Sequence, residues 1–563
     1  MQVCKVERLD DLPLLSKVIQ DSKLSTHLDD HFSTHGNWDG ISLGKVVSGW
    51  LLFILSRSDH RLSYVEEWVS DHDYTLKKLL SEPTLNSSSF SDDHLGVVLD
   101  HLSVDEQWDA FESTYTKSFI DIYDLKKETD LTVRLDAFIS QSFREEGDLF
   151  KKGHSKQHRK GLPQVKTMAA TLDPLSLPIA SEIASGNTPD DVMYMPVIKK
   201  VQNTIEKKGL LYVFDCKGGS KEIRHHLHFS SNYYLCPLSK LQCSNDQLNN
   251  YLKVKPTNLI EIKNEEDEIL AQAFEISQKV ENMGKDWQER RIVVRSVNYA
   301  DSQIKKLENN ISKTQEELSK FFTKKSGRTH PKNMEDATEK ANHILSKNGV
   351  SDFISYKVLE TIKERTIGAY GGKPARIESK KTYQIDYHIV DKKLEKHKEL
   401  LGWRVYATNA KEEKLNTIQA VECYRSEYKI EHTFNKLLNK ITALVPIYLQ
   451  KENRVKGLIR LLLLALKFES IIQNQARKSL DGKEIKGVYP GNPNRVTKNP
   501  TTKLLLYPFR EISLIFLKNE QGKVFTQLLP LNNVQEKIIS LLGANENIYN
   551  DLISAFNSEI VET

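Results

Sequence analysis

The chain has 563 residues, of which 39% are hydrophobic and 28% are charged, so it is long enough for roughly two to four domains with a sizeable core. Its 80 basic and 76 acidic residues leave a formal net charge of only +4, so any basic surface for a polyanionic partner has to be local. The five cysteines form no C-x-x-C pair and no dense framework, which argues against disulfides and a zinc finger and fits a reducing cytosol.

The beginning of the chain, Met1 to Glu7, lacks the apolar run of a secretory signal. Two later apolar runs, Val46 to Leu55 and Leu458 to Leu466, are shorter than the roughly 20 residues that span a membrane. We predict a buried helix at each run, with Arg460 inside the second and Lys467 at its end. We expect no membrane partner and a cytoplasmic location.

Residues 1–115 are predicted to form a mostly helical domain, with Ser42 as a helix N-cap and a break around Ser81 to Pro83. This segment is not notably basic. A helix-turn-helix pattern is too degenerate to recognise here, so the residues alone give a helical domain with no assigned partner.

From residue 128 to 238 the pattern changes to short strands, and two of them end in an acid. Strands are predicted at Leu131–Asp136, Asp148–Lys151, Gln164–Leu172, Leu210–Asp215 and Tyr233–Leu238, with a helix at Asp190–Lys207. Strands that first meander and then alternate with helices favour an α/β fold with a mixed sheet and helices on its faces. Acids at the carboxyl ends of buried strands lie where such a sheet exposes functional groups, and their oxygens suit Mg²⁺.

The densest basic stretch of the chain lies between these strands. We predict that it contacts phosphates, because cationic contacts supply most of the affinity of DNA binders; a solvated turn is the alternative. Gly153 and Gly161 argue against a helix that would present its histidines to zinc, and the histidines between Arg224 and His228 are predicted to lie on the surface. The candidate residues for phosphate contact are Lys152, His154, Lys156, His158, Arg159 and Lys160.

Residues 239–415 are more strongly charged. Apolar residues from Val297 to Phe321 recur at spacings of three and four, which predicts a helix that packs in an intramolecular helix pair. Gly368 to Pro374 lacks the P-loop spacing, so an ATPase is rejected. Strands are predicted at Tyr383–Val390 and Trp403–Thr408. Trp403, Trp287 and the Arg290, Arg291, Arg295 group are candidates for DNA contact, since an indole can stack on a base; core packing is the alternative for the tryptophans.

Residues 416–475 contain a predicted helix from Tyr424 to Lys440, with Ile430, Phe434, Leu437 and Ile441 on one apolar stripe. Glu431 lies on the edge of that stripe. From this segment alone, an amphipathic surface helix with an ordinary boundary glutamate is the alternative to a functional acid. Residues 476–563 are predicted to hold a strand at Leu504–Tyr507, an apolar run at Ile512–Leu517, and helices at Val534–Leu542 and Ile548–Phe556, with no readable role.

The order Asp136, Asp215, Glu431 resembles the DDE triad of bacterial insertion-sequence transposases. The third-acid helix of that family often carries Y-x2-R-x3-E-x6-K; Tyr424 and Glu431 fit this spacing, while Glu427 and Leu438 stand at the Arg and Lys positions. Further resemblance lies in Gly153 to Lys166, Ala184 to Asp191 and Leu444 to Gly457, so the similarity covers nearly the whole chain.

The resemblance implies an RNase H-like α/β catalytic core, in residues 128–238 and 416–475, interrupted by an insertion domain in residues 239–415. In this interpretation the helical domain of residues 1–115 helps to bind transposon ends, and residues 476–563 form a dimer contact or a DNA contact. Asp136, Asp215 and Glu431 are implied to hold two Mg²⁺ or Mn²⁺ ions, with Asp136 bridging them. Candidate DNA contacts beside the third acid are Tyr424, Arg425, Lys436 and Lys440.

The implied activity is metal-dependent DNA strand cleavage and strand transfer at the terminal inverted repeats of the protein's own insertion sequence. Its partners would be double-stranded transposon ends and target DNA, bound by a homodimer in the bacterial cytoplasm, at the nucleoid. Two alternatives stay open: a nuclease on the same fold that does not join strands, and an inactive DNA-binding relic of a transposase. The long insertion argues against the nuclease, and the intact acid triad argues against the relic.

Overall fold

A computed structural model describes residues 2–34, 38, 40–127, 131–154, 161–264, 266–323, 330–369, 371–372, 374, 376–426, 428–435 and 447–554. The chain divides into two compact units, which are described separately below. The first unit comprises residues 1–236 and 423–563, and the second comprises residues 237–422. Within the described residues, no helix is long and apolar enough to cross a membrane.

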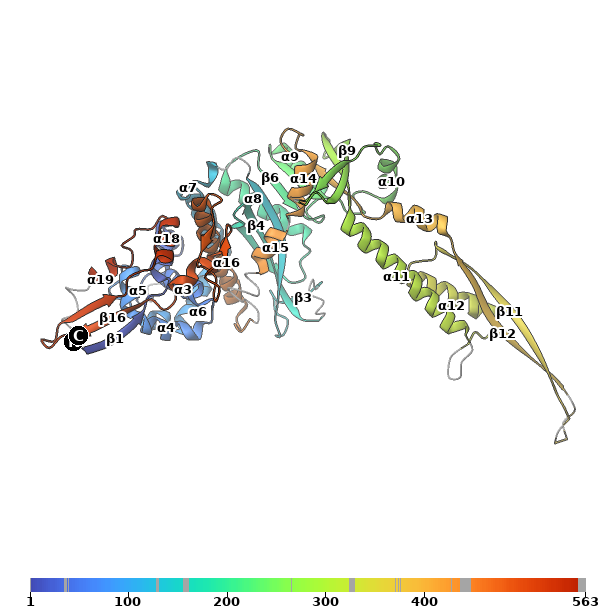
Figure 1. The fold of residues 1–563 in the computed structure, drawn as a ribbon, viewed down its shortest axis with the longest axis horizontal. Helices are drawn as coiled ribbons and strands as arrows, with labels where there is room; N and C mark the ends of the chain where they lie inside the picture. The colour runs from blue at the N-terminus through green and yellow to red at the C-terminus, as the bar shows by residue number, and fades with distance from the viewer. Residues whose placement is uncertain are drawn as a thin grey trace. The chain divides into compact units, whose positions relative to one another are not determined.

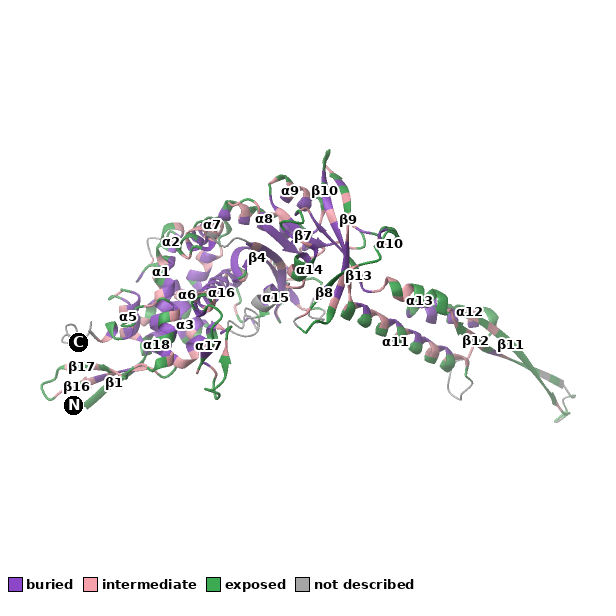
Figure 2. Ribbon diagram, turned by 45° about the horizontal axis from the view of Figure 1, so that its top comes forward, coloured by how far each residue is buried: buried purple, intermediate pink, exposed green. Residues whose placement is uncertain are grey.

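The first unit contains a mixed sheet whose strands follow the order β3-β4-β2-β6-β7, with β5 paired to β4 (Figure 1). The pairs β2–β4 and β4–β5 are antiparallel, whereas β6 runs parallel to β2 and β7 runs parallel to β6. Every residue of β4 is buried, because the strand has partners on both edges and α8 packs against it (Figure 2). The strand bounds are β2 (Thr132–Gln141), β3 (Lys151–Lys152), β4 (Pro163–Asp173), β5 (Leu177–Ser185), β6 (Leu211–Phe214) and β7 (Tyr233–Pro237).

Most of the predicted elements of this sheet are confirmed. β2, β4, β6 and β7 lie where strands were expected, and α8 (Asp191–Ile205) is the predicted helix. The strand predicted at Asp148–Lys151 shrinks to the two-residue β3, and β5 was not predicted. The mixed α/β class expected from the alternation of strands and helices is therefore observed.

The helices of the first unit pack around one long helix, α16 (Glu452–Leu480), which contacts α6, α3 and β5. Both predicted buried helices are confirmed, as α3 (Leu43–Arg57) and α16. Two buried cations of α16 have partners inside the unit: Arg460 Nη1 donates to the Leu102 carbonyl at 2.8 Å, and Lys467 Nζ donates to Thr116 Oγ1 at 2.6 Å. The remaining bounds are α1 (Leu12–Asp21), α2 (Leu24–His31), α4 (Val65–Asp71), α5 (Asp73–Leu79), α6 (Asp92–Leu102), α7 (Asp105–Ile122), α9 (Lys221–Phe229), α15 (Tyr428–Asn435), α17 (Thr502–Leu506), α18 (Asn533–Leu541) and α19 (Asp551–Ser554).

Both ends of the first unit meet in a small antiparallel sheet of β1 (Gln2–Arg8), β16 (Ser513–Lys518) and β17 (Val524–Leu528), which was not predicted. A short pair, β14 (Ile485–Lys486) and β15 (Val496–Thr497), lies between α16 and α17 in sequence. The strand predicted at Leu504–Tyr507 is wrong: α17 forms there, because Thr501 Oγ1 accepts from the Leu504 amide and caps a helix. Of the helix predicted at Ile548–Phe556, the described part contains α19; Phe556 lies outside the described residues.

The second unit has an antiparallel sheet in the order β13-β10-β9-β8 and, beside it, a helix pair and a two-stranded ribbon. The predicted heptad helix is α11 (Val297–Phe322); Leu307, Ile311 and Leu318 are buried, and α11 packs on α12, which confirms an intramolecular pair. β9 and β10 were not predicted. The other bounds are β8 (Ile260–Lys263), β9 (Ile269–Asn282), β10 (Lys285–Ser296), β11 (Ile354–Ile367), β12 (Arg376–Ile389), β13 (Trp403–Thr408), α10 (Asn245–Lys253), α12 (Met334–Lys347), α13 (Asp391–Leu400) and α14 (Thr417–Arg425), which contains the boundary to the first unit.

Candidate active site

Asp136 and Asp215 occupy neighbouring positions on the parallel strands β2 and β6. The register pairs Leu135 with Phe214, so the two aspartates are the next residues along each strand. Asp136 is the one position between Val133 and Gln141 that is not fully buried, and Asp215 is likewise half-buried. The two acids therefore lie side by side where an otherwise buried part of the sheet reaches solvent.

Asp215 is held by donors on two elements. Tyr194 Oη of α8 donates to Asp215 Oδ1 at 2.6 Å, and the backbone amides of Lys217 and Gly218 lie 2.9 and 3.3 Å from the same oxygen. Burial, followed by the charges of Asp215 and Asp136, raises the pKa of Tyr194 well above its usual value, so the phenol remains a donor. Gly218 permits this close approach, because a Cβ there would lie 2.7 Å from the Tyr194 ring.

A third carboxylate, Asp190, pairs with two lysines, of which Lys217 lies two residues after Asp215 in sequence. Lys166 Nζ of β4 lies 2.5 Å from Asp190 Oδ1, and Lys217 Nζ, two residues after Asp215, bonds to Asp190 Oδ2. Burial would raise the pKa of Asp190, but the two ammonium groups together hold it below its usual value. Burial lowers the pKa of Lys217, but Asp190 and then Asp215 raise it, so this cation stays charged beside the acid pair.

The segment that carries the third predicted acid covers the face of β2 on which Asp136 lies. Alternation along the strand places Arg134, Asp136 and Phe138 on one face. The Phe138 ring packs against Phe434 of α15 with 4.8 Å between centroids, and Arg134 Nη1 donates to the Cys423 carbonyl at 2.9 Å. Two contacts along one face of the strand thus fix the chain before and within α15.

Glu431 is exposed on α15, between the buried Ile430 and Phe434. Residues three apart share a helix face, so Glu431 is one turn from the side chain that packs beside Asp136. Among the described residues, no group of three or more His, Cys, Asp or Glu side chains is gathered so that it could hold a metal ion. The aspartate pair supplies the hard oxygen donors that Mg²⁺ or Mn²⁺ prefers, but in this structure Glu431 does not join the pair in a closed cluster.

Only part of the predicted phosphate-contacting stretch can be located. Lys152 and His154 are exposed, and the Lys152 amide donates to Glu146 Oε1 at 2.8 Å. Their side chains are accessible to a polyanion, as that prediction requires. The remaining residues of the prediction, and the two motif positions that depart from the family pattern, lie outside the described residues: Lys156, His158, Arg159, Lys160, Lys436, Lys440, Glu427 and Leu438.

The aromatic residues predicted to contact DNA are buried. Tyr424 is 9% exposed and Arg425 is half-buried, so the tyrosine ring packs inside the first unit. In the second unit Trp403 is also 9% exposed, lies 5.9 Å from the Phe274 ring and donates its indole N–H to the Glu399 carbonyl at 3.0 Å. Rings buried to this degree leave no face for a base to stack on, and core packing describes them instead.

The arginines of β10 are also committed within the second unit. Arg290 Nε lies 2.9 Å from Glu275 Oε2, and its Nη1 donates to the Ala410 carbonyl at 2.9 Å. Arg291 is buried and pairs with Glu289 at 2.5 Å. These side chains stabilise the sheet of the second unit instead of offering a free basic surface.

Sequence reasoning missed the residues that support the acid pair. Tyr194 lies in a helix where an aromatic residue is expected to pack in a core, and only the tertiary contact reveals its bond to Asp215. Lys217 lies two residues after Asp215, so its position in the sequence was a usable signal for a cation beside that acid. Lys166 and Asp190 are 24 positions apart in sequence, and nothing in the pattern predicts their contact.

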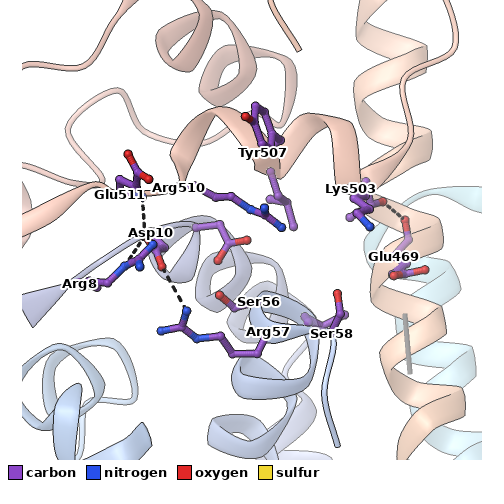
Figure 3. Close-up of a pocket in the computed structure, with 14 residues that line it drawn as sticks. Arg8, Asp10, Ser56, Arg57, Ser58, Glu469, Lys503, Tyr507, Arg510 and Glu511 are labelled. Carbon is purple, nitrogen blue, oxygen red and sulfur yellow. Dashed lines mark hydrogen bonds and ion pairs between the residues drawn. The ribbon is translucent and has the colours of Figure 1, made fainter. Parts of the chain in front are cut away.

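A separate charged pocket of about 380 Å³ lies in the first unit, at the start of α1, the end of α3 and the stretch before β16 (Figure 3). Asp10 is its centre of charge: it accepts from Arg8 Nη2 at 2.9 Å and from the Glu511 amide at 2.8 Å, and Arg57 Nη1 lies 3.9 Å away. Neither Asp136 nor Asp215 lines it. Its charged lining residues are Arg8, Asp10, Asp11, Arg57, Glu469, Lys503, Arg510 and Glu511.

The fold and the site together define a mixed α/β protein with two aspartates on adjacent parallel strands. A family model described as a domain of unknown function, DUF4277, matches residues 4–114, which include the N-terminal helices and exclude the acid pair. No curated protein matches the chain. Among solved structures, the chain is similar to one titled "Cryo-EM structure of piggyBac transposase synaptic complex with hairpin DNA", at 8% sequence identity and a TM-score of 0.33, over 98% of this chain and 82% of that chain.

Proposed function

We propose that this chain is a DDE transposase that cleaves DNA at the ends of its own insertion sequence and joins those ends to target DNA. The observation that supports this most strongly is the placement of Asp136 and Asp215 on adjacent parallel strands, with α15 packed on the same face of β2. The order of the acids in the sequence and the motif around Glu431 resemble the transposase family independently of this geometry.

The proposal includes an RNase H-like core made of residues 128–238 and 416–475, with residues 239–415 as an insertion domain. The antiparallel β2, β4 and β5, followed by parallel strands that alternate with α8 and α9, support a core of this kind. The second unit, residues 237–422, is a compact body whose sequence separates Asp215 from Glu431. An insertion domain between the second and third acids would have this property.

Asp136 and Asp215, with Glu431 as the third ligand, would hold two Mg²⁺ or Mn²⁺ ions, which when bound activate the attacking oxygen and stabilise the leaving oxygen of a phosphodiester. The chain's own contribution is orientation. Tyr194 and the amides of Lys217 and Gly218 hold one oxygen of Asp215 by hydrogen bonds, which leaves its other oxygen available as a metal ligand. Lys217, held by Asp190, places a permanent positive charge beside the acids, where it favours an anionic phosphate.

The partners in this proposal are double-stranded transposon ends and target DNA. Two ends must be joined, so we expect a homodimer assembled on DNA, in the bacterial cytoplasm at the nucleoid. Lys152, at the end of β3, and His154, just after it, are exposed and can contact phosphates.

The experiment that tests the proposal is Mg²⁺- or Mn²⁺-dependent cleavage and joining of a labelled duplex that carries the gene's own flanking ends. Asp136→Asn and Glu431→Gln should each reduce cleavage and joining by more than about 100-fold, since even residues outside the inner ligand shell of metal sites are worth about 10- to 100-fold. Asp93→Asn, an exposed aspartate on α6, is the matched control and should act like the wild type. Full cleavage by Asp136→Asn would refute the assignment of the acid pair.

A second candidate function is a DNA-binding protein without catalysis. It is favoured by the position of Glu431, which does not close a three-acid cluster with the aspartates. The same assay separates the two: binding of the end duplex without cleavage at any Mg²⁺ or Mn²⁺ concentration would select the second candidate. Cleavage without joined product would instead indicate a nuclease.

A further inference from the structure

The second unit contains a long antiparallel ribbon, β11 paired with β12, in which Ile362 to Thr366 of β11 and Ser379 to Lys381 of β12 are all exposed. The register is continuous from Ile354 opposite Ile389 to Ile367 opposite Arg376. Figure 1 shows the two strands, in yellow, running on past the helix pair of α11 and α12. Alternation of burial along β11 ends at Val358, and Leu359 to Thr366 are all exposed, as the green of the ribbon in Figure 2 shows.

The two faces of the ribbon differ. Tyr356, Ile385 and Tyr387 lie on one face and pack on the helix pair, in a cluster with Leu318 and Ile344. These contacts of the inner face hold the base of the ribbon on the helix pair. The opposite face, here called the outer face, carries Lys357, Thr361 and Lys363 of β11 and, opposite them in register, Asp386, Thr382 and Lys380 of β12.

One pair of directly opposed residues on the outer face carries like charges. Lys357 is opposite Asp386 in register, and Lys381, on the inner side, forms an ion pair with Glu360 at 2.7 Å. Lys363, by contrast, lies directly opposite Lys380. Like charges at directly opposed positions destabilise a strand pair, so this juxtaposition opposes folding of the ribbon.

Neither Lys363 nor Lys380 forms an ion pair or side-chain hydrogen bond with another residue in the described part of the chain, and both are exposed. Lysines on unpaired strands can also serve to prevent edge-to-edge association. That role requires a charge on each edge, but it does not explain why two lysines lie directly opposite each other across the ribbon. A polyanion that contacts both strands explains that arrangement.

We infer that the outer face of the distal half of the β11–β12 ribbon binds the phosphate backbone of double-stranded DNA, with Lys363 and Lys380 as its contacts. The choice of DNA as the polyanion rests on the proposed function. A two-stranded antiparallel ribbon has a shape that a DNA groove admits, and the exposed part beyond Thr361 and Thr382 leaves both strands free to enter it. The ribbon thereby replaces the buried Trp403 and the ion-paired Arg290 as the DNA-contacting element of the second unit.

The test is equilibrium binding of a fluorescent duplex to the full-length protein in EDTA, followed by anisotropy at several salt concentrations, so that no cleavage step contributes. Lys363→Gln with Lys380→Gln should weaken binding by at least about tenfold near 0.1 M salt and reduce the slope of log K against log salt by about 2. Lys363→Arg with Lys380→Arg should restore both values. The matched control, Lys381→Gln with Lys320→Gln, removes the same charge from two lysines that are ion-paired off the outer face, and should leave the slope unchanged.

A double glutamine variant with wild-type affinity and slope overturns the inference. So does displacement of the duplex by polyglutamate with equal potency per charge, because the surface would then fit an acidic protein. Thermal unfolding of each variant is measured in parallel; since the substitution removes a repulsion, the glutamine variant should melt no lower than the wild type. If the wild-type protein itself binds no DNA, the proposed function fails. If the wild type binds DNA and the ribbon variants bind it equally well, the ribbon inference alone fails.

Discussion

Asp11, at the N-terminus of α1, should make the protein less stable at neutral pH than at pH 4. Its side chain is 6% exposed and lines the charged pocket of Figure 3, next to Asp10. Burial raises its pKa from 3.8 to about 6, a hydrogen bond from Ser56 opposes part of the rise, and the charge of Asp10 adds to it. The fold therefore favours the protonated carboxyl, which exists only below about pH 6.

The size of the effect follows from the shift. A change of about two pKa units at about 1.4 kcal/mol each corresponds to about 3 kcal/mol of unfolding free energy. The folded-state pKa lies above the unfolded-state value, so the cost is absent below about pH 4, grows as the pH rises towards 6, and is fully present above 6. Asp11→Asn removes the ionisation at nearly constant volume, and should raise the unfolding free energy by up to about 3 kcal/mol at pH 7.5.

The measurement is urea unfolding of the wild type and Asp11→Asn at half-unit steps from pH 4 to 8. The difference between the two proteins should be near zero at pH 4 and reach its maximum by pH 7. Asp93→Asn, on the exposed face of α6, serves as the control and should show no pH-dependent difference. A gain that is equal at pH 4 and pH 8, or a loss at every pH, would show that ionisation of Asp11 is not the cause.

Three further predictions concern the core and the site. Tyr194→Phe removes a hydrogen-bond donor from Asp215, so it should raise the Mg²⁺ concentration for half-maximal cleavage and lower the cleavage rate by about 10- to 100-fold. The melting temperature should not fall. An unchanged Mg²⁺ dependence would reject a positioning role for Tyr194. Asp173→Ala leaves the guanidinium of Arg134 buried without its carboxylate and should cost about 3 to 5 kcal/mol in urea unfolding, whereas a loss below 1 kcal/mol would contradict a buried charge pair. Burial lowers the pKa of Lys467 to about 8, below its unfolded value, so the charged ammonium destabilises the fold fully below pH 8 and no longer does so towards pH 10. The unfolding free energy of the wild type, relative to that of Lys467→Met, should therefore rise over that range. A difference that does not change with pH would refute burial of the charge as the cause.

β6 could be predicted because it is a short, continuously apolar run that ends just before Asp215, where the sheet reaches solvent. β2 was predicted only in part: it continues five residues beyond Asp136 to Gln141, so Asp136 lies within the strand and not at its end. α16 was predictable for a related reason: the nine residues from Leu458 to Leu466, apolar except for Arg460, are too few to span a membrane and too apolar for a surface helix.

Other elements gave no comparable signal. β10 contains Lys, Asp, Glu or Arg at six of its twelve positions. Some of these side chains pair with neighbours such as Glu275, and their charge hides the alternation of a strand. β5 contains Pro178, which lowers strand preference even though the strand pairs with β4. At Leu504–Tyr507 a short apolar run fits a strand or a helix equally, and the capping Thr501 decided the outcome.

The position of Asp136 and Asp215 is itself an argument for function. Asp136 lies within β2 and Asp215 directly follows β6, the parallel strand beside it, so two carboxylates are placed next to each other, where they repel. A sequence selected only for stability would not keep this pair. Tyr194 and the turn after β6 hold Asp215 in place against the repulsion, so part of the surrounding structure is arranged to maintain the arrangement. Violations of the rules of stable packing concentrate at functional sites, and a bound divalent cation would turn this repulsion into attraction.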